Sequence, residues 1–443
     1  MLTLAEMTPP CLRLDIDVAE GIPNIPEQPI GRSAACAWIL VRMHTEPLGV
    51  LLLAIPPEGI SARQLADSVE QELGSALSAR ARACDGQWPG PVKESGFVPS
   101  SESPFLASRK EVLAKAPHIT VVVCTRARPS GLAACLDSLV RQEFPRFSIL
   151  VVDNAPRSSV SRTVVQSFGS NHIDIEYMVE SKLGLSWARN AALSSASAGI
   201  MAFIDDDEVA DRWWLAEIAR GFVSHRDAQS VSGIMLPAQL DTSAQVRFEQ
   251  YGGHHKHRGF EPATFSAATF VEQHPMYPLP PFGTGGNMAF QRDSLREIGG
   301  FDTALGAGTL ALGGADTRAF TELLLRGGTI VYQPTAITHH YHRRTKAELR
   351  SLMFAYGAGL TAFYSSLVLA DPRRLVALGT LVPNFLRDAH GPGSLRSGDL
   401  TGDFPPDLRW SNRRGLVSGP ARYLASRVVD RRVRRAVRSR AGG

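Results

Sequence analysis

Apolar runs and helical spacings alternate through the middle of the chain. Continuous runs such as Val121-Val122-Val123 and Ile149-Leu150-Val151-Val152 are typical of strands that are covered on both faces of a sheet. The pattern predicts strands at 119–124, 147–152, 173–178 and 199–204, with helices between them at 131–142, 159–168 and 186–196. This alternation predicts an α/β fold with a doubly wound, Rossmann-like sheet.

The first hundred residues show a smaller version of the same texture. Two apolar strands, 38–43 and 49–55, precede a helix that the hydroxyl of Ser61 can cap. A stretch rich in Gly, Pro and Ser follows at 85–117. We therefore expect four parts: a small α/β module at 1–100, a linker at 101–116, the doubly wound domain at 117–345 and a helical region at 346–443.

The helical region contains two apolar pieces, 351–370 and 375–386. The first piece has no charged residue and is long enough to span a bilayer, but its glycines, serines and tyrosines make it a poor span. We expect an amphipathic helix pair that packs on the core or lies at a membrane surface.

Composition adds a charge asymmetry to this picture. Of the 443 residues 44% are hydrophobic and 20% charged, which excludes a disordered or fibrous chain. The net charge is only +4, yet residues 408–443 contain eleven arginines and one acid, which leaves residues 1–407 with a net charge of −6. Arginines among Val, Leu and Ala at helical spacing suit an anionic membrane surface. Nucleic acid is the less favoured partner, because no aromatic residues are interleaved with the arginines.

Two further features concern location. The five cysteines are scattered without metal-ligand spacing, which is typical of reduced thiols. The first twenty residues have neither a basic start nor an uninterrupted apolar stretch, so we expect no secretory signal. The expected location is cytoplasmic, peripheral at the inner face of the plasma membrane.

Polar residues follow three of the predicted strands. The first strand runs into Thr125 and Arg128, the second into Asp153, and the fourth into the run Asp205-Asp206-Asp207-Glu208. Ligands of doubly wound sheets bind beyond the carboxyl ends of strands, so these side chains are expected at one site. Neighbouring carboxylates repel one another unless a cation lies among them, and oxygen ligands suit Mg²⁺ or Mn²⁺. A run of acids is often only a solvated surface, but this one directly follows a strand.

Seven motifs stand in a characteristic order: VVVCTR at 121–126, VVDN at 151–154, GLSWARN at 184–190, FIDDD at 203–207, GGNMAF at 285–290, IGGFD at 298–302 and GGAD at 313–316. In this order they resemble the family-2 glycosyltransferases, which have the GT-A fold. The resemblance covers roughly residues 117–345, about half of the chain.

The resemblance implies a role for several residues. Asp153 would contact the nucleobase, usually uracil, with Thr125 and Arg128 nearby. Arg189 and Asn190 would shape the ribose and diphosphate side. Asp205 and Asp207 would be the ends of the D-x-D signature, the first near the ribose and the second on the metal. Asp316 would be the general base that takes the proton of the acceptor hydroxyl. At Ala315 the chain departs from the family, which commonly has Glu there.

Other candidates have structural alternatives. Gly285, Gly286 and Asn287 form a loop expected to pass close to a sugar or diphosphate, although an ordinary tight turn has the same glycines. Trp213 and Trp214 are candidates for stacking on an acceptor sugar, or for packing on a helix face.

The remaining candidates are histidines, and one alternative role concerns Asp316. In metal-dependent relatives a histidine after the catalytic acid often completes the cation site, so His340 or His342 is the candidate here. His254, His255 and His257 lie in a glycine-rich stretch and are expected to be solvated. Asp316 has a structural alternative as the N-cap of the following helix.

The expected function is an inverting glycosyltransferase that moves a hexose from a nucleotide diphosphate sugar to an acceptor hydroxyl with Mn²⁺ or Mg²⁺. The acceptor is expected to be a glycan, a lipid-linked saccharide or a small molecule. Two alternatives stay open. A nucleotidyltransferase would release pyrophosphate, and a non-catalytic sugar-nucleotide-binding protein, suggested by Ala315, would bind without turnover.

Overall fold

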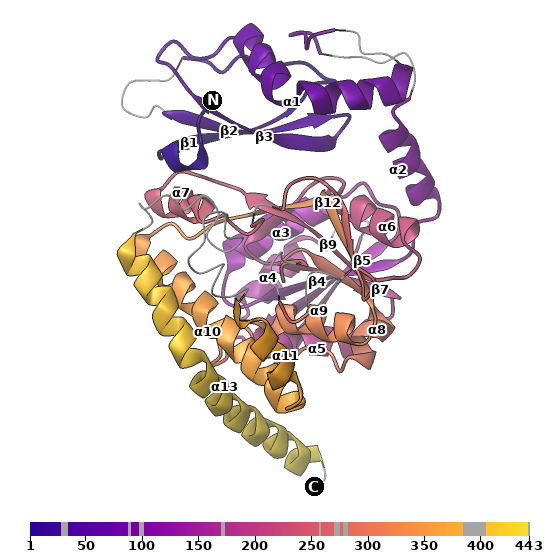
Figure 1. Ribbon diagram of the computed structural model, residues 1–443. Helices are drawn as coiled ribbons and strands as arrows, with labels where there is room; N and C mark the ends of the chain where they lie inside the picture. Colours follow the sequence, from indigo (N-terminus) through magenta and orange to yellow (C-terminus); the bar gives the residue numbers. More distant parts are fainter. Residues whose placement is uncertain are drawn as a thin grey trace.

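The computed structural model describes residues 1–27, 34–86, 90–96, 102–169, 173–256, 258–269, 275–277, 282–383 and 405–441. Figure 1 shows a three-stranded sheet with a long helix at one end of the molecule, a large sheet between helices in the middle, and a long C-terminal helix along one side.

The large sheet is mixed rather than wholly parallel. Its strand order in the described residues is β10-β12-β9-β11-β7-β4-β5-β6, with β8 paired to β12. The strands are β4 (Ile119–Thr125), β5 (Phe147–Asn154), β6 (Asp174–Glu180), β7 (Ile200–Asp205), β8 (Glu208–Ala210), β9 (Ala228–Pro237), β10 (Ala263–Phe265), β11 (Met288–Gln291) and β12 (Thr329–His340). β4 to β7 run parallel, whereas β11 is antiparallel to both neighbours, β7 and β9. The predicted α/β class of fold is confirmed, and the reversal at the short β11 is an addition to it.

Helices cover both faces of this sheet. They are α3 (Pro129–Val140), α4 (Val160–Ser167), α5 (Leu185–Ser195), α6 (Trp214–Ser224), α7 (Ser243–Gln250), α8 (Arg292–Glu297) and α9 (Ala315–Leu325). Successive strand residues point to opposite faces, so Val121 joins an apolar cluster with α3 and α6, while Val122 joins another with α5 and α9. This two-sided burial explains the continuous apolar runs in the sequence.

The N-terminal unit consists of a 3-10 turn (Leu4–Glu6), β1 (Cys11–Asp17), β2 (Cys36–Met43), β3 (Glu46–Ala54) and α1 (Ala62–Asp85). The Ser61 hydroxyl accepts a hydrogen bond from the Gln64 backbone N–H, as the sequence predicts for a capped helix. β1 pairs with β2 in parallel, and the sequence pattern did not predict it.

The N-terminal unit packs on the large sheet through apolar and ionic contacts. Trp38 and Leu40 of β2 share a buried cluster with Leu236 and Ile337 of the large sheet. Arg42 reaches across to Asp211 at 2.8 Å. The contact therefore buries both an apolar surface and a charge pair.

The stretch between the two sheets contains a helix, α2 (Pro104–Ala114), where a linker was predicted. Arg109 of α2 donates to Glu217 of α6 at 2.8 Å, and both side chains are buried. The domain boundaries derived from the sequence stay a proposal, but this connection is folded onto the large sheet.

The C-terminal region is helical, as predicted, with α10 (Lys346–Ala370), α11 (Arg374–Thr380) and α13 (Pro406–Ala441). Among the described helices, α10 alone is long and apolar enough to cross a membrane, but 44% of its apolar window is buried. A Cβ added to Gly357 of α10 would lie 2.1 Å from the Asn412 carbonyl oxygen, so α10 and α13 touch backbone to backbone. α10 thus packs on the core, one of the two arrangements expected for it. Residues 384–386 of the second predicted apolar piece lie outside the described residues.

Candidate active site

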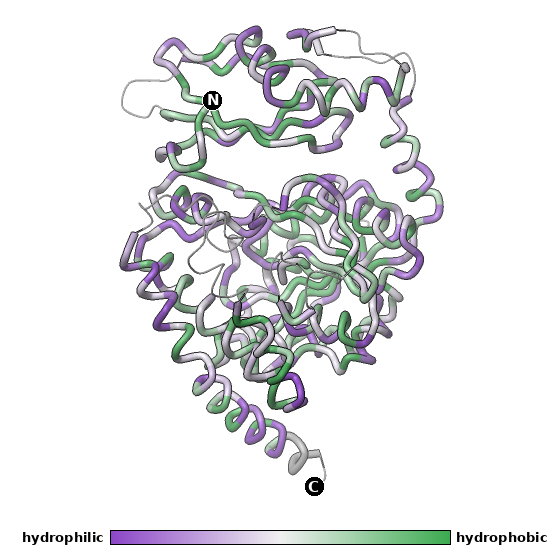
Figure 2. The backbone as a smooth tube through the Cα atoms, in the orientation of Figure 1, coloured by the Kyte–Doolittle hydropathy of each residue, from purple (hydrophilic) through white to green (hydrophobic). Residues whose placement is uncertain are grey.

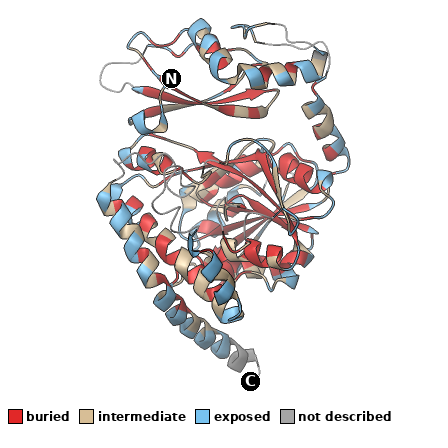
Figure 3. Cartoon of the chain, viewed as in Figure 1, coloured by how far each residue is buried: buried red, intermediate tan, exposed pale blue. Residues whose placement is uncertain are grey.

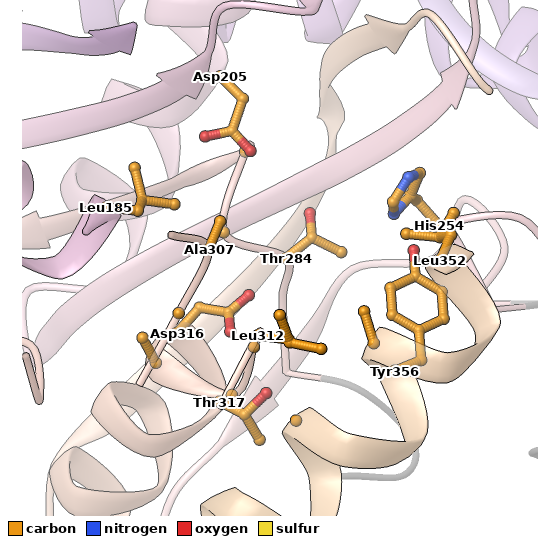
Figure 4. A pocket seen from close by; sticks show the side chains of 18 of the residues that line it. Leu185, Asp205, His254, Thr284, Ala307, Leu312, Asp316, Thr317, Leu352 and Tyr356 are labelled. Atoms are coloured by element: carbon orange, nitrogen blue, oxygen red, sulfur yellow. The ribbon is translucent and has the colours of Figure 1, made fainter. Parts of the chain in front are cut away.

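A cavity of about 640 Å³ opens where β4, β5 and β7 end. Loops at 283–286 and 306–317 and one side of α10 complete its wall. Figure 4 shows Asp205, Thr284, Asp316, His254 and Tyr356 around this space. Side chains from distant parts of the sequence therefore share one cavity at the carboxyl ends of parallel strands, as the topology predicts.

Two arginines, Arg128 and Arg189, form hydrogen bonds with the three aspartates of the acidic run. Asp205 Oδ1 accepts a hydrogen bond from Arg189 at 3.1 Å. Asp206 accepts from Arg128 at 3.0 Å, and Asp207 accepts from the same guanidinium at 2.7 Å. In this arrangement the guanidinium groups offset the carboxylate repulsion that the sequence implies.

Protonation in the cavity suits metal binding. Burial opposes the charge of Asp207, but His340, Arg128 and Arg343 outweigh it, so the pKa of Asp207 is lowered. Burial lowers the pKa of His340 to about 3, although Asp207 opposes the shift. At neutral pH the site therefore presents a carboxylate and a neutral imidazole, the forms that bind metals. Burial raises the pKa of Asp205 to about 6 against the attraction of Arg189.

The two candidate histidines have different positions. His340 lines the cavity with its Nε2 3.6 Å from Asp207 Oδ1. His342 is not among the residues that line the cavity, and its Nδ1 lies 2.9 Å from His340 Nδ1. His342 Nε2 lies 2.7 Å from Glu249 Oε1. With Nε2–H of His342 on Glu249, its Nδ1 can accept from His340, which leaves the His340 Nε2 lone pair facing Asp207. His342 is thus placed to orient His340, and its predicted role as a direct ligand stays a prediction.

We expect Glu249→Gln to weaken Mn²⁺ binding by about 10- to 100-fold, the usual cost of losing a group that orients a metal ligand. The amide can donate where the carboxylate only accepts, so it no longer fixes the tautomer of His342. Titration of the protein with Mn²⁺, followed by the electron paramagnetic resonance of the free ion, measures the affinity. The matched control is Glu176→Gln, at an exposed position on β6 away from the histidines. Equal affinity of Glu249→Gln and the parent would contradict the orienting role.

Asp316 lines the same cavity, close to the acidic run. Helix α9 has Gly314 as its N-cap, at φ 83°, so Asp316 is not the cap that the structural alternative required. A Cβ added to Gly285 would lie 2.9 Å from Asp316 Oδ2 and 3.2 Å from the Arg189 guanidinium, which itself holds Asp205. Asp316 and Asp205 therefore belong to one connected set of side chains.

The glycines at 285 and 286 are required by close approach. A Cβ on Gly286 would lie only 1.6 Å from Glu208 Oε1. Ala315, where the family commonly has Glu, is 3% exposed and belongs to an apolar cluster with Leu305, Ala362 and Tyr423. Ala315 therefore lies at the boundary between this apolar cluster and the cavity, which it also lines.

Three predicted contact residues do not line the cavity. Asn287 is fully buried, with its amide bonded to the Trp214 indole at 2.9 Å and to two backbone carbonyls. Trp214 is fully buried as well, and Trp213 packs under the guanidinium of Arg109 at 4.5 Å. The lining of the cavity gives no support to the predicted contact of these residues with donor or acceptor, which stays a prediction. Asn287 and Trp214 support β11 and α6 from inside.

Other predicted site residues form hydrogen bonds within the protein. Thr125 donates to Asp206 at 2.7 Å, so its hydroxyl and Arg128 hold the acidic run. Both residues line the cavity, and their place near the nucleobase stays a prediction. Asn190 bonds to the backbone of Phe301. Asp153 is buried at the end of β5, where one carboxylate oxygen accepts from Tyr177 at 2.8 Å and the other has no hydrogen-bond partner among the described residues.

Sequence reasoning gave no individual role to several residues that line the cavity. Glu208 is 1% exposed and neither carboxylate oxygen has a hydrogen-bond partner among the described residues. Arg343, Tyr356 and His254 reach the cavity from three different elements. His254 was expected to be solvated, but it packs edge-on against His340 at 4.4 Å. His257 lies outside the described residues. Only Glu208, next to the aspartates, had a signal in the sequence.

The donor set fits a divalent cation. Asp205 and Asp207 offer carboxylate oxygens and His340 a neutral imidazole nitrogen, a mixture that Mn²⁺ accepts more readily than Mg²⁺. The ring nitrogens of His254, His340 and His342 also lie within 4.8 Å of one another. The hydrogen bond between His340 and His342 uses Nδ1 of both rings, so His340 Nε2 stays available on the side of Asp207, where we expect the ion.

The chain is similar in sequence to known glycosyltransferases. Residues 120–299 match the family model described as Glycosyl transferase family 2. Succinoglycan biosynthesis protein ExoM of Rhizobium meliloti is 28% identical over 238 residues, which are 52% of this chain and 69% of that protein. Glucosyl-dolichyl phosphate glucuronosyltransferase of Haloferax volcanii is 24% identical over 194 residues, 42% of this chain and 57% of that protein.

Two further similarities cover more of this chain. The pre-mycofactocin glycosyltransferase of Mycobacterium tuberculosis is 24% identical over 293 residues, 64% of this chain and 56% of that protein. Among solved structures, a mannosyltransferase from Pyrobaculum calidifontis in complex with GDP-Man and Mn²⁺ has a TM-score of 0.44 and 19% identity, over 73% of this chain and 93% of that one.

Proposed function

We propose that this chain, whose residues 120–299 belong to glycosyl transferase family 2, is an inverting hexosyltransferase that uses a nucleotide diphosphate sugar, most simply a UDP-sugar. The observation that carries the proposal is the single cavity lined by Asp205, Asp207, His340 and Asp316. The diphosphate of an activated donor needs a metal-binding site. The acceptor hydroxyl needs a carboxylate on the opposite side of the transferred sugar.

The residues have the following roles in the proposed reaction. Asp207 and His340, with Asp205 beside them, would hold Mn²⁺ or Mg²⁺, which neutralises charge on the departing diphosphate. Arg128 and Arg343, which contact Asp207, are placed to bind phosphate oxygens. Asp153 is 1% exposed and does not line the cavity, so its contact with the nucleobase rests on the family resemblance alone.

Asp316 would act as the general base. As the acceptor oxygen forms its bond to the anomeric carbon, the bond from that carbon to the diphosphate oxygen breaks and the nucleoside diphosphate leaves with the electron pair. The hydroxyl proton goes to the Asp316 carboxylate. Attack from the face opposite the leaving group inverts the anomeric centre.

The acceptor side of the cavity is largely apolar. Leu312, Leu352, Tyr356, Leu360 and Phe363 line it. This supports a glycan, lipid-linked or small-molecule acceptor with an apolar part, and with the basic tail it supports a location at the cytoplasmic face of the plasma membrane. Relatives named for succinoglycan biosynthesis and for a dolichyl phosphate substrate are consistent with such acceptors.

A donor screen tests the proposal. We expect one nucleotide sugar to release nucleoside diphosphate in a reaction that needs Mn²⁺ or Mg²⁺, and chelation to stop it. Release of pyrophosphate would establish the nucleotidyltransferase alternative instead. Nucleotide binding without turnover of any sugar nucleotide, in the presence of extracts containing acceptors, would favour the non-catalytic alternative.

A further inference from the structure

Helix α13 has one face that is fixed against the protein. Its buried residues include Leu408, Gly415, Gly419, Tyr423 and Ser426. The Tyr423 hydroxyl donates to Asp302 at 2.8 Å, and Asn412 donates to the Met353 carbonyl at 3.0 Å. These contacts set the rotation of α13, so the residues on its opposite face are committed to the outside.

That outer face carries an apolar stripe. Trp410 is 63% exposed, Val417 85%, Leu424 52% and Val428 48%. Their spacing of seven, seven and four residues places them in one line along the helix. Figure 2 shows apolar and polar residues alternating along α13, and Figure 3 shows that exposed residues recur along its length. A line of exposed apolar side chains on a folded helix indicates a binding surface.

Arginines border this stripe on both sides. With 3.6 residues per turn, Arg413 and Arg431 fall on one side of it and Arg414 and Arg432 on the other. All four are exposed, and no acidic residue in the described part of the chain pairs with them. An apolar line between two rows of unpaired cations matches the boundary of an anionic bilayer, where acyl chains lie beneath phosphate headgroups.

We propose that the outer face of α13, formed by Trp410, Val417, Leu424 and Val428 and bordered by arginines, binds an anionic membrane surface. This proposal rests on the membrane location given in the proposed function, and it names the surface of the protein that would bind the membrane. A second copy of the chain fits poorly, because pairing two such faces brings arginines together. Nucleic acid would use the arginines but leave the apolar stripe in water.

Vesicle sedimentation of the full chain tests the surface. We expect binding to vesicles of equimolar phosphatidylcholine and phosphatidylglycerol that weakens with salt, and little binding to phosphatidylcholine alone. Val417→Asp and Leu424→Asp should each lower binding at least tenfold. The matched control is Val160→Asp on α4, where an exposed valine lies far from α13 in sequence and should be neutral.

Several outcomes would contradict the proposal that α13 binds an anionic membrane. Unchanged vesicle binding by both α13 variants, equal binding to neutral vesicles, or no binding to anionic ones would each do so. If Val417→Asp alters the oligomeric state of the protein and not its vesicle binding, the occupant is a second copy. If duplex DNA binds the parent and both variants equally and vesicles do not bind, the occupant is nucleic acid. None of these assays measures sugar transfer. The proposed function could therefore fail while the membrane proposal holds, and the membrane proposal could fail while the proposed function holds.

Discussion

Asp316→Asn is expected to lower sugar transfer by about 100- to 10,000-fold, the range that a positioned general base contributes. The amide keeps the shape of the side chain but cannot take the acceptor proton. Because Arg128 and Arg343, the proposed phosphate-binding groups, contact Asp207 and not Asp316, the variant should still bind the nucleoside diphosphate with the parent's affinity. Initial rates with the active donor and calorimetric titration of the nucleotide measure the two effects separately.

The matched control for this variant is Asp293→Asn, at an exposed position on α8. It should match the parent in rate and nucleotide affinity. Asp316→Asn with an unchanged rate would rule out the proposed base. Loss of nucleotide binding together with a lower melting temperature would instead show that Asp316 supports the start of α9.

Asp207→Ala should abolish Mn²⁺ binding and lower transfer at least about 100-fold, because the charge on the leaving diphosphate would lose its main stabiliser. A second effect has the opposite sign. Arg128 and Arg343 each contact the Asp207 carboxylate, and without it both guanidinium groups are free to bind phosphate. Metal-free binding of the nucleoside diphosphate should therefore be as tight as in the parent or tighter.

Binding assays with and without a chelator separate these two effects. Asp174→Ala, at the exposed start of β6, is the matched control and should behave as the parent in both assays. Mn²⁺-dependent turnover that survives Asp207→Ala would exclude Asp207 as a ligand. Weaker metal-free nucleotide binding would show that the two arginines need the carboxylate to keep their positions.

The alternating core of the fold could be predicted from the sequence, because strands buried on both faces leave continuous apolar runs. The run at 147–152 became β5 with two more residues at its end, and those residues, Asp153 and Asn154, are the polar ones. β1 and β11 could not be predicted in the same way. β11 has only four residues and takes its place between β7 and β9 through long-range pairing that no local pattern records.

The candidate site was predictable where chemistry follows a strand and not where tertiary packing decides. Asp205, Asp207, Asp316 and His340 share the cavity, as the order of motifs implies. Asn287 of the GGNMAF motif and Trp214 were candidates too, yet they bond to each other inside the core. Glu249 sits in a helix with no motif at all, and only the folded chain brings it to His342.

The contact between the N-terminal unit and the large sheet bears on how such chains can evolve. Arg13 reaches His339, the residue next to His340, and Arg42 holds Asp211 just beyond the acidic run. Recombination that exchanged the first hundred residues between relatives would alter the support behind the metal-binding strand as well as the exchanged part. The two segments are therefore expected to be inherited together, and chimeras that join them from different sources should need compensating changes at positions 211 and 339.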